Sequence, residues 1–217
     1  MILPPRAVIF DCDGVLVDSE PPTFVLLQEN LAQHGLPLTH AQMDDLFLGG
    51  TMRGLYDKAL ALGAELPATW VDDFYALLYA RLAKGVALIP GIETVLDALD
   101  AARIPYAVGS NGSDEKMRIS LGQHPALLAR LHGRLFSGQT LGTPKPHPGL
   151  YLHCARALHV GPQDCVVIED SPTGAKAAAN AGMRCFGYAA TGDGARLAAE
   201  GATVFHDMAR LPALLGL

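Results

Sequence analysis

The stretch that decides the fold is AVIFDCDGVLVDSE, residues 7–20. A short apolar run, Ala7 to Phe10, is followed at once by the acids Asp11 and Asp13 and then by Gly14. A short apolar run that ends in turn residues is typical of a buried strand. Asp11 as a cap and Asp13-Gly14 as a plain turn pair are a structural alternative. Because two acids at the end of a buried strand are costly without a compensating cation or ligand, we favour a functional role.

Working outward, the same strand-like pattern recurs with helix-like segments between the runs. The further apolar runs cover residues 106–109, 135–138, 165–170, 185–188 and 203–205, and helical segments cover 92–102, 149–158 and 172–181. This alternation predicts an α/β fold, a Rossmann-like parallel sheet with helices on both faces. Ligands of such sheets bind beyond the carboxyl ends of the strands, where Asp11, Ser110 and Asp170 fall.

Residues 22–84 interrupt this alternation. They contain helical patterns at 24–34, 52–62 and 68–83, with no convincing strand between them. We therefore predict an α/β core domain of residues 1–17 and 88–217, with a helical cap domain of residues 18–87 inserted after the first strand.

Composition restricts the partners. Half of the 217 residues are hydrophobic, 18% are charged and the formal net charge is −6, which fits a globular protein and disfavours binding to nucleic acid. No apolar stretch approaches the roughly 20 residues that span a bilayer. The four cysteines form no CxxC pair, which fits a reducing compartment. We expect a cytoplasmic protein, a monomer or weak oligomer, with no nucleic-acid or membrane partner.

A second acidic pair ends the run at residues 165–170. Glu169 and Asp170 open the segment EDSPTGAKAAANAGM, residues 169–183. If this strand neighbours the first, Asp11, Asp13, Glu169 and Asp170 converge on one cation site. Ligation by oxygen alone favours Mg²⁺.

Two loops supply groups suited to a phosphate. In TPKPHPGLY, residues 143–151, prolines stiffen the loop around Lys145, whose charge can offset the acids as a phosphate dianion approaches. In VGSNGS, residues 108–113, Ser110 and Asn111 lie among small residues ahead of a helix, a geometry that suits a phosphate oxygen. Ser-Asn-Gly is equally typical of an ordinary turn.

Together these motifs resemble the haloacid dehalogenase-like (HAD) superfamily phosphatases with a small helical cap, over nearly the whole chain. The resemblance is carried by DxDG, KPxP and EDS followed by AGM, while SNGSDEKM and LFSG are similar to the branch with sugar-phosphate and 6-phosphogluconate phosphatases. It implies a Mg²⁺-dependent phosphoric monoester hydrolase. The expected substrate is a small phosphorylated metabolite, a sugar phosphate or a sugar-acid phosphate such as 6-phosphogluconate.

The resemblance also implies roles for the residues. Asp11 attacks phosphorus to form an aspartyl phosphate, and Asp13 is the general acid and base. Ser110, Asn111 and Lys145 bind the phosphoryl group. The metal ligands are the side chains of Asp11 and Asp170 and the backbone carbonyl of Asp13, with Glu169 acting through water. The Asp13 carboxyl must begin protonated, which contact with Mg²⁺ would oppose.

Other activities remain as alternatives. A phosphomutase of the β-phosphoglucomutase type shares this chemistry and resembles the chain as far as the cap, but such mutases carry a histidine where this sequence has Thr23. A haloacid dehalogenase is less favoured because its chemistry does not require Asp13. A non-enzymatic phosphate-binding module is the remaining alternative.

The cap segment LFLGGTMRGL, residues 46–55, is the candidate for substrate selectivity. Gly49 and Gly50 break the helical pattern before Thr51 and Arg53. The structural alternative makes Thr51 a helix cap and Arg53 a surface charge. By resemblance this turn is the specificity loop, where Arg53 can hold a substrate carboxylate.

Overall fold

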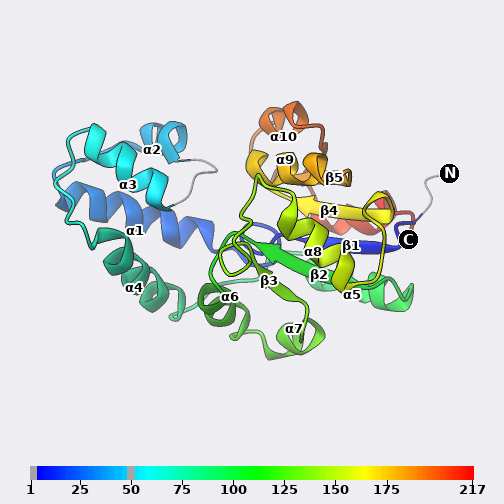
Figure 1. Cartoon of the computed structure of the whole chain (residues 1–217). Coiled ribbons are helices and arrows are strands. Elements are labelled where there is room, and N and C mark those ends of the chain that lie inside the picture. Colours follow the sequence, from blue (N-terminus) through cyan, green and yellow to red (C-terminus); the bar gives the residue numbers. More distant parts are fainter. Residues whose placement is uncertain (1–3, 48–51) are drawn as a thin grey trace. The chain divides into compact units, whose positions relative to one another are not determined.

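The chain forms two compact units in the computed structural model, which describes residues 4–47 and 52–217 (Figure 1). The side chains of residues 44–47 also lie outside the description. Unit 1 contains the described residues up to Asp18 together with Ala87–Leu217, and unit 2 is Ser19–Val86. None of the helices in the described ranges combines the length and apolar character needed to cross a bilayer.

Unit 1 is an α/β domain. Its strands are β1 (Ala7–Phe10), β2 (Tyr106–Ser110), β3 (Leu135–Ser137), β4 (Cys165–Glu169), β5 (Arg184–Tyr188) and β6 (Thr203–Phe205). Its helices are α5 (Ile92–Ala101), α6 (Asp114–Leu121), α7 (Pro125–Arg130), α8 (Gly149–Ala157), α9 (Pro172–Asn180), α10 (Ala195–Ala199) and α11 (Leu211–Leu214), with 3₁₀ turns η1 (Pro162–Asp164) and η2 (Met208–Arg210).

All strands of unit 1 belong to one parallel sheet with the order β3-β2-β1-β4-β5-β6. The predicted α/β fold and the predicted strands are confirmed, with bounds that differ by one residue at most. Strand β4 pairs with β1, Ile168 opposite Phe10, so the condition for convergence of the two acidic motifs is met. The strand order reverses between β1 and β4, and such a reversal opens a crevice at the carboxyl edge of a sheet.

Alternation along the strands divides the core of unit 1 into two faces. Ile9 packs with Val167 and with residues of α8 and α9, the helices that lie over β1, β2, β4 and β5 in Figure 1. On the opposite face Phe10 meets the Tyr106 ring edge-on, at 6.2 Å between centroids. The Arg130 side chain of α7 contacts the Tyr106 hydroxyl and Asp97 and Asp100 of α5. The strand ends that carry the acids are thereby fixed by packing on both sides.

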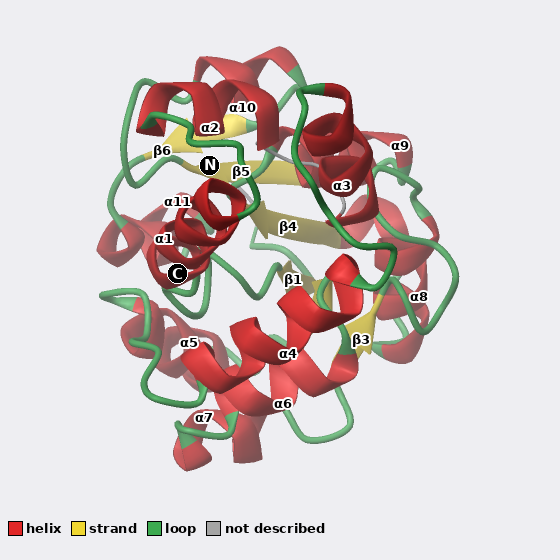
Figure 2. Cartoon of the chain, turned by 90° about the vertical axis from the view of Figure 1, so that its left-hand side faces the viewer, coloured by secondary structure: helices red, strands yellow, loops and turns green. Residues whose placement is uncertain are grey.

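Unit 2 consists, in its described part, of helices and loops (Figure 2). The helices are α1 (Glu20–Gln33), α2 (His40–Phe47), α3 (Met52–Ala61) and α4 (Trp70–Leu82). Trp70 stacks on Phe74 with 5.2 Å between centroids, and its indole N–H donates to Asn30 of α1 at 2.6 Å. Helix α2 was missing from the sequence prediction, because its sequence HAQMDDLF has too few apolar residues to show a helical period.

Candidate active site

The candidate site lies at the carboxyl ends of the central strands of unit 1. Asp11 follows β1, Ser110 ends β2 and Asp170 follows β4. After Asp11 the chain turns sharply at Gly14, which has a φ of +75°. A Cβ atom at Gly14 would overlap the carboxylate of Asp170, so the turn brings backbone against an acid at a distance that only glycine allows.

Lys145 joins the first and second acidic motifs. Its Nζ lies 2.5 Å from Asp11 Oδ1 and 2.5 Å from Glu169 Oε1, and its side chain is only 3% exposed. The KPxP loop, stiffened by its prolines, thus places the ammonium group of Lys145 between the two carboxylates. The peptide bond between Lys145 and Pro146 is cis.

The electrostatics of this group follow from burial and from Lys145. Burial raises the pKa of Asp11 to about 7, although Lys145 opposes the shift. For Glu169 burial also favours the neutral form, but Lys145 and the hydrogen-bond donors outweigh it and lower the pKa. The acids raise the pKa of Lys145 despite its burial, so it stays charged. Glu169 and Lys145 are therefore a charged pair. For Asp11 the positive charge of Lys145 does not outweigh the effect of burial, so its pKa stays raised.

Glu169 is surrounded by hydrogen-bond donors from the protein. Its Oε1 accepts from Lys145 and from the Tyr151 hydroxyl, at 2.6 Å. Its Oε2 accepts from the backbone N–H of Asp170 and from both the backbone N–H and the hydroxyl of Ser171. A carboxylate with this many protein donors holds the lysine and the β4–α9 loop in place.

Asp13 points to a different cation. Its Oδ1 lies 2.8 Å from Nζ of Lys116, a residue of α6. Burial disfavours the charged form of Lys116, but Asp13 more than offsets this and its pKa is raised. The sequence predicted that the charge of Lys145 offsets the acids, but it gave no sign of Lys116, which pairs with Asp13.

The side chains of Ser110 and Asn111 have different surroundings. The buried Ser110 hydroxyl oxygen accepts from the Gly112 N–H at 2.9 Å, which leaves its proton for another acceptor. The Asn111 amide makes two bonds to the backbone of Lys145: its Oδ1 accepts from the N–H at 2.8 Å and its Nδ2 donates to the carbonyl at 3.2 Å. Asn111 therefore fixes the loop that carries Lys145.

These residues form a group suited to a hard cation. One ligand oxygen each from Asp11, Glu169 and Asp170 can be chosen such that all three lie within 4.8 Å of one another. With Asp13, Lys116 and Lys145 included, four carboxylates face two ammonium groups, a formal charge of −2.

The family model for haloacid dehalogenase-like hydrolases matches residues 5–182, which include every residue of this site. The chain belongs to the haloacid dehalogenase-like hydrolase family. It is 32% identical over 214 residues to the 6-phosphogluconate phosphatase of Escherichia coli K12, covering 96% of this chain and 94% of that protein. It is 33% identical over 181 residues to a phosphoglycolate phosphatase of Xylella fastidiosa, covering 82% of this chain and 78% of that protein.

A solved structure of a HAD family hydrolase from Deinococcus radiodurans, with bound phosphate and sodium, has the same fold. It matches with a TM-score of 0.81 and 33% identity, over 98% of this chain and 96% of that chain. The predicted family membership is confirmed.

The HAD site fits Mg²⁺ on the chemistry of its donors. Its candidate ligands are carboxylate oxygens, which Mg²⁺ prefers, and the surplus negative charge favours a divalent cation. Because the lone pairs of Glu169 are occupied by protein donors, the residues best placed to hold the ion directly are Asp11 and Asp170.

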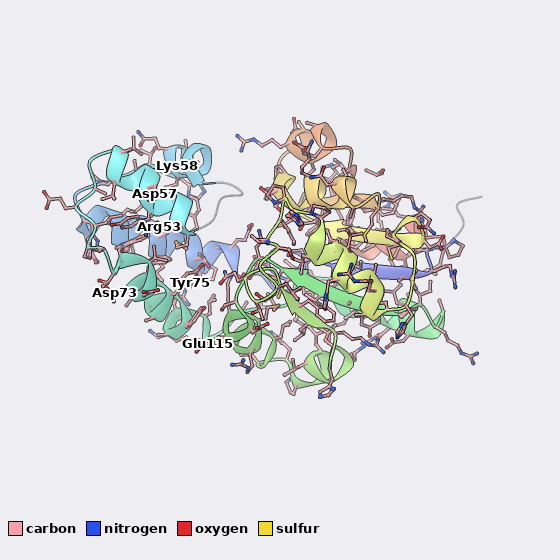
Figure 3. The ribbon with its side chains drawn as sticks, viewed as in Figure 1. Arg53, Asp57, Lys58, Asp73, Tyr75 and Glu115 are labelled. Atoms are coloured by element: carbon pink, nitrogen blue, oxygen red, sulfur yellow. The ribbon has the colours of Figure 1, made fainter. Side chains whose placement is uncertain are left out.

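The predicted selectivity residues belong to unit 2. Thr51 lies outside the described residues. Arg53 is exposed on α3, where its Nε lies 3.5 Å from Asp57 Oδ1 and its guanidinium lies 4.8 Å from the centre of the Tyr56 ring (Figure 3). These contacts within the helix hold Arg53 weakly, so it can turn to another anion.

Two residues of the site, Lys116 and Tyr151, were not predicted from the sequence. Lys116 could have been found from the helix start at Ser113, because the Ser113 hydroxyl caps its backbone N–H at 3.0 Å and so fixes the first turn of α6. Tyr151 lies in the quoted KPxP segment, but nothing in a sequence separates a buried hydroxyl donor from an ordinary core aromatic.

Proposed function

We propose that this HAD hydrolase is a Mg²⁺-dependent phosphatase that acts on a small phosphorylated sugar acid or related acid. The observation that carries the proposal is the buried group of Asp11, Lys145 and Glu169 beside Asp170, at the point where the strand order reverses. The two relatives named for phosphatase activity on acidic substrates support the substrate class.

In the proposed reaction Asp11 is the nucleophile and forms an aspartyl phosphate, which water then hydrolyses. Ser110 donates a hydrogen bond from its hydroxyl to a phosphoryl oxygen, and the positive charge of Lys145 stabilises the same phosphoryl group. Asn111 acts by holding the backbone of Lys145, which refines the expectation that it binds phosphate itself.

Asp13 passes a proton to the leaving oxygen and later takes one from water. Its carboxylate is paired with Lys116 at 2.8 Å, so before it can donate it must leave this ion pair and take up a proton from solvent.

Magnesium would be held by the side chains of Asp11 and Asp170 and by the backbone carbonyl of Asp13. When bound it offsets the charge of the acids, so that a phosphate dianion can approach Asp11. Glu169 contributes mainly by fixing Lys145 and the loop at Asp170.

Phosphatase activity is favoured over phosphomutase activity by Thr23. Its hydroxyl donates to the backbone carbonyl of Ser19 at 2.7 Å, so it stabilises the first turn of α1. A threonine engaged in this way does not replace the histidine that times proton transfer in similar mutases.

The test is phosphate release from 6-phosphogluconate, 2-phosphoglycolate and glucose 6-phosphate with Mg²⁺ or with EDTA. We expect hydrolysis that EDTA abolishes, that Asp11→Asn eliminates, and that prefers the acidic substrates. The exposed Asp193→Asn variant is the control for loss of one carboxylate. Activity that survives EDTA or the Asp11→Asn change would contradict the mechanism. Conversion of β-glucose 1-phosphate to glucose 6-phosphate faster than its hydrolysis would favour the mutase.

A further inference from the structure

Lys116 differs from Lys145 in how firmly the protein holds it. Lys145 is 3% exposed and lies between two carboxylates, whereas Lys116 is 14% exposed and its recorded ion pair is with Asp13 alone. Its neighbours on α6 do not compete for it: Asp114 accepts from the Thr140 hydroxyl at 2.5 Å, and Glu115 is exposed. Lys116 is therefore the site lysine that can change its partner.

Lys116 also lies close to two residues of the proposed reaction, Ser110 and Asp13. A Cβ atom placed on Gly112 would be 3.1 Å from the Ser110 hydroxyl oxygen, 3.3 Å from Cδ of Lys116 and 3.5 Å from Oδ2 of Asp13. These three side chains thus surround one point. Under the proposed function, Ser110 contacts the phosphoryl group and Asp13 contacts the leaving oxygen. Lys116 therefore lies beside the part of the leaving group that is attached to that oxygen.

The substrate atom nearest to the leaving oxygen is the ester carbon. A carboxylate attached directly to this carbon, as in 2-phosphoglycolate, stays close to the leaving oxygen in every conformation. The carboxylate of 6-phosphogluconate lies at the far end of its carbon chain and cannot stay there. An ammonium group that faces the leaving oxygen can therefore distinguish these two acids.

We propose that Lys116 is a substrate-binding residue for a carboxylate carried on the phosphoester carbon, and that this carboxylate replaces Asp13 as its partner. Binding of the acid then frees the Asp13 carboxylate to take up a proton from solvent and to turn toward the leaving oxygen while the substrate is in place. A neutral substrate leaves the ion pair of Asp13 and Lys116 intact and gains no such help. The inference rests on the proposed function and names the substrate class of the same site.

The test compares two matched pairs of substrates by kcat/KM with Mg²⁺. The first pair is 2-phosphoglycolate and 2-hydroxyethyl phosphate, which differ in the carboxylate next to the ester carbon. The second is 6-phosphogluconate and sorbitol 6-phosphate, which differ in a distant carboxylate. The wild type should prefer 2-phosphoglycolate over its neutral partner by at least about tenfold, in line with a charged hydrogen bond.

Replacement of the lysine should remove that preference. In Lys116→Met the ratio for the first pair should fall by about tenfold to a hundredfold, while the ratio for the second pair stays constant. Lys116→Arg should keep much of the preference because it keeps the charge. Lys176→Met, which removes a lysine from an exposed ion pair with Glu200, is the control and should behave as the wild type.

The outcomes distinguish a failure of the proposed phosphatase function from a failure of the role proposed for Lys116. Absence of Mg²⁺-dependent hydrolysis of all four substrates by the wild type would remove the proposed function. Hydrolysis with no preference for 2-phosphoglycolate in the wild type would overturn the inference alone, whether or not the variants fold. Equal losses on both members of the first pair in Lys116→Met would also overturn it, because Lys116 would then act only by positioning Asp13.

Discussion

Lys145 is the residue on which the electrostatics of the site depend most. Removal of one partner from a buried ion pair costs about 3–5 kcal/mol, because a charge is left without compensation. Here Asp11 can take up a proton, since burial already raises its pKa to about 7 from 3.8. The folded state therefore holds a proton that the unfolded chain releases above 3.8, and the stability from Asp11 is lost as the pH rises through about 7.

This linkage makes the cost of Lys145→Met depend on pH. Because Lys145 opposes the pKa shift of Asp11, its removal should be tolerated better at pH 5, where Asp11 is neutral, than at pH 8. The measurement is thermal unfolding in EDTA at both values, with the exposed Lys176→Met variant as control. A cost that is the same at pH 5 and pH 8 would show that Asp11 does not take up the proton.

Tyr151 tests whether the support behind the acids matters for catalysis. Its fully buried hydroxyl donates to Glu169 at 2.6 Å, and burial raises its pKa well above the ordinary value, so it remains a donor. Tyr151→Phe keeps the ring that lies 5.0 Å from Lys145 Nζ and removes only the hydroxyl. We expect a loss of about 1.5–3 kcal/mol in unfolding free energy and a lower kcat, because Glu169 holds Lys145 less firmly.

The matched control is Tyr188→Phe on β5, since Tyr188 is also buried but no hydrogen bond of its hydroxyl is recorded among the described residues. Denaturant unfolding should show little change for this variant. If both variants lose the same unfolding free energy, the hydrogen bond from Tyr151 to Glu169 does not contribute specifically to stability.

Helix α6 is the element that positions Lys116, and its N-cap Ser113 and its interior Ser120 should respond in opposite directions to replacement by alanine. Ser113 caps the helix by accepting the backbone N–H of Lys116 at 3.0 Å, so Ser113→Ala should cost about 1 kcal/mol. Ser120 is buried, and its hydroxyl has no hydrogen-bond partner in the described structure, so Ser120→Ala should add about 1 kcal/mol. Chemical denaturation of both variants measures the two signs, and destabilisation by Ser120→Ala would reveal a partner for that hydroxyl.

Among the elements of unit 1, the strands could be predicted from the sequence, whereas the side-chain contacts between elements could not. The run AVIF and the acids after it predict β1, because a parallel strand that is buried on both faces consists almost entirely of apolar residues. The pairing of Lys116 with Asp13 joins residues that are far apart in the sequence and that meet only through the order of the strands. The saturation of Glu169 was equally hidden, because it depends on donors from α8 and from the β4–α9 loop.

For the whole molecule, the joint between the two units allows a direct test of their independence. The backbone N–H of Asp18 donates to the carbonyl of Ala87 at 2.9 Å, and Val17 forms a bridge with Leu88. The two chain segments that lead into and out of unit 2 are therefore hydrogen-bonded to each other within unit 1. Because unit 1 also has its own sheet and core, a short turn can replace residues 19–86 without stretching the chain.

A chain in which Asn-Gly joins Asp18 to Ala87 should fold cooperatively, since this dipeptide suits a tight turn between antiparallel segments. It should still be stabilised by Mg²⁺, because Asp11 and Asp170 belong to unit 1. If unit 2 supplies selectivity, as the sequence predicts, the shortened chain should lose its preference for 6-phosphogluconate over sorbitol 6-phosphate. Arg53→Ala in the full chain should then reproduce part of that loss. Circular dichroism melts with and without Mg²⁺ measure the first two expectations, and kcat/KM ratios measure the third. A shortened chain that folds, binds Mg²⁺ and keeps the preference would move the selectivity into unit 1.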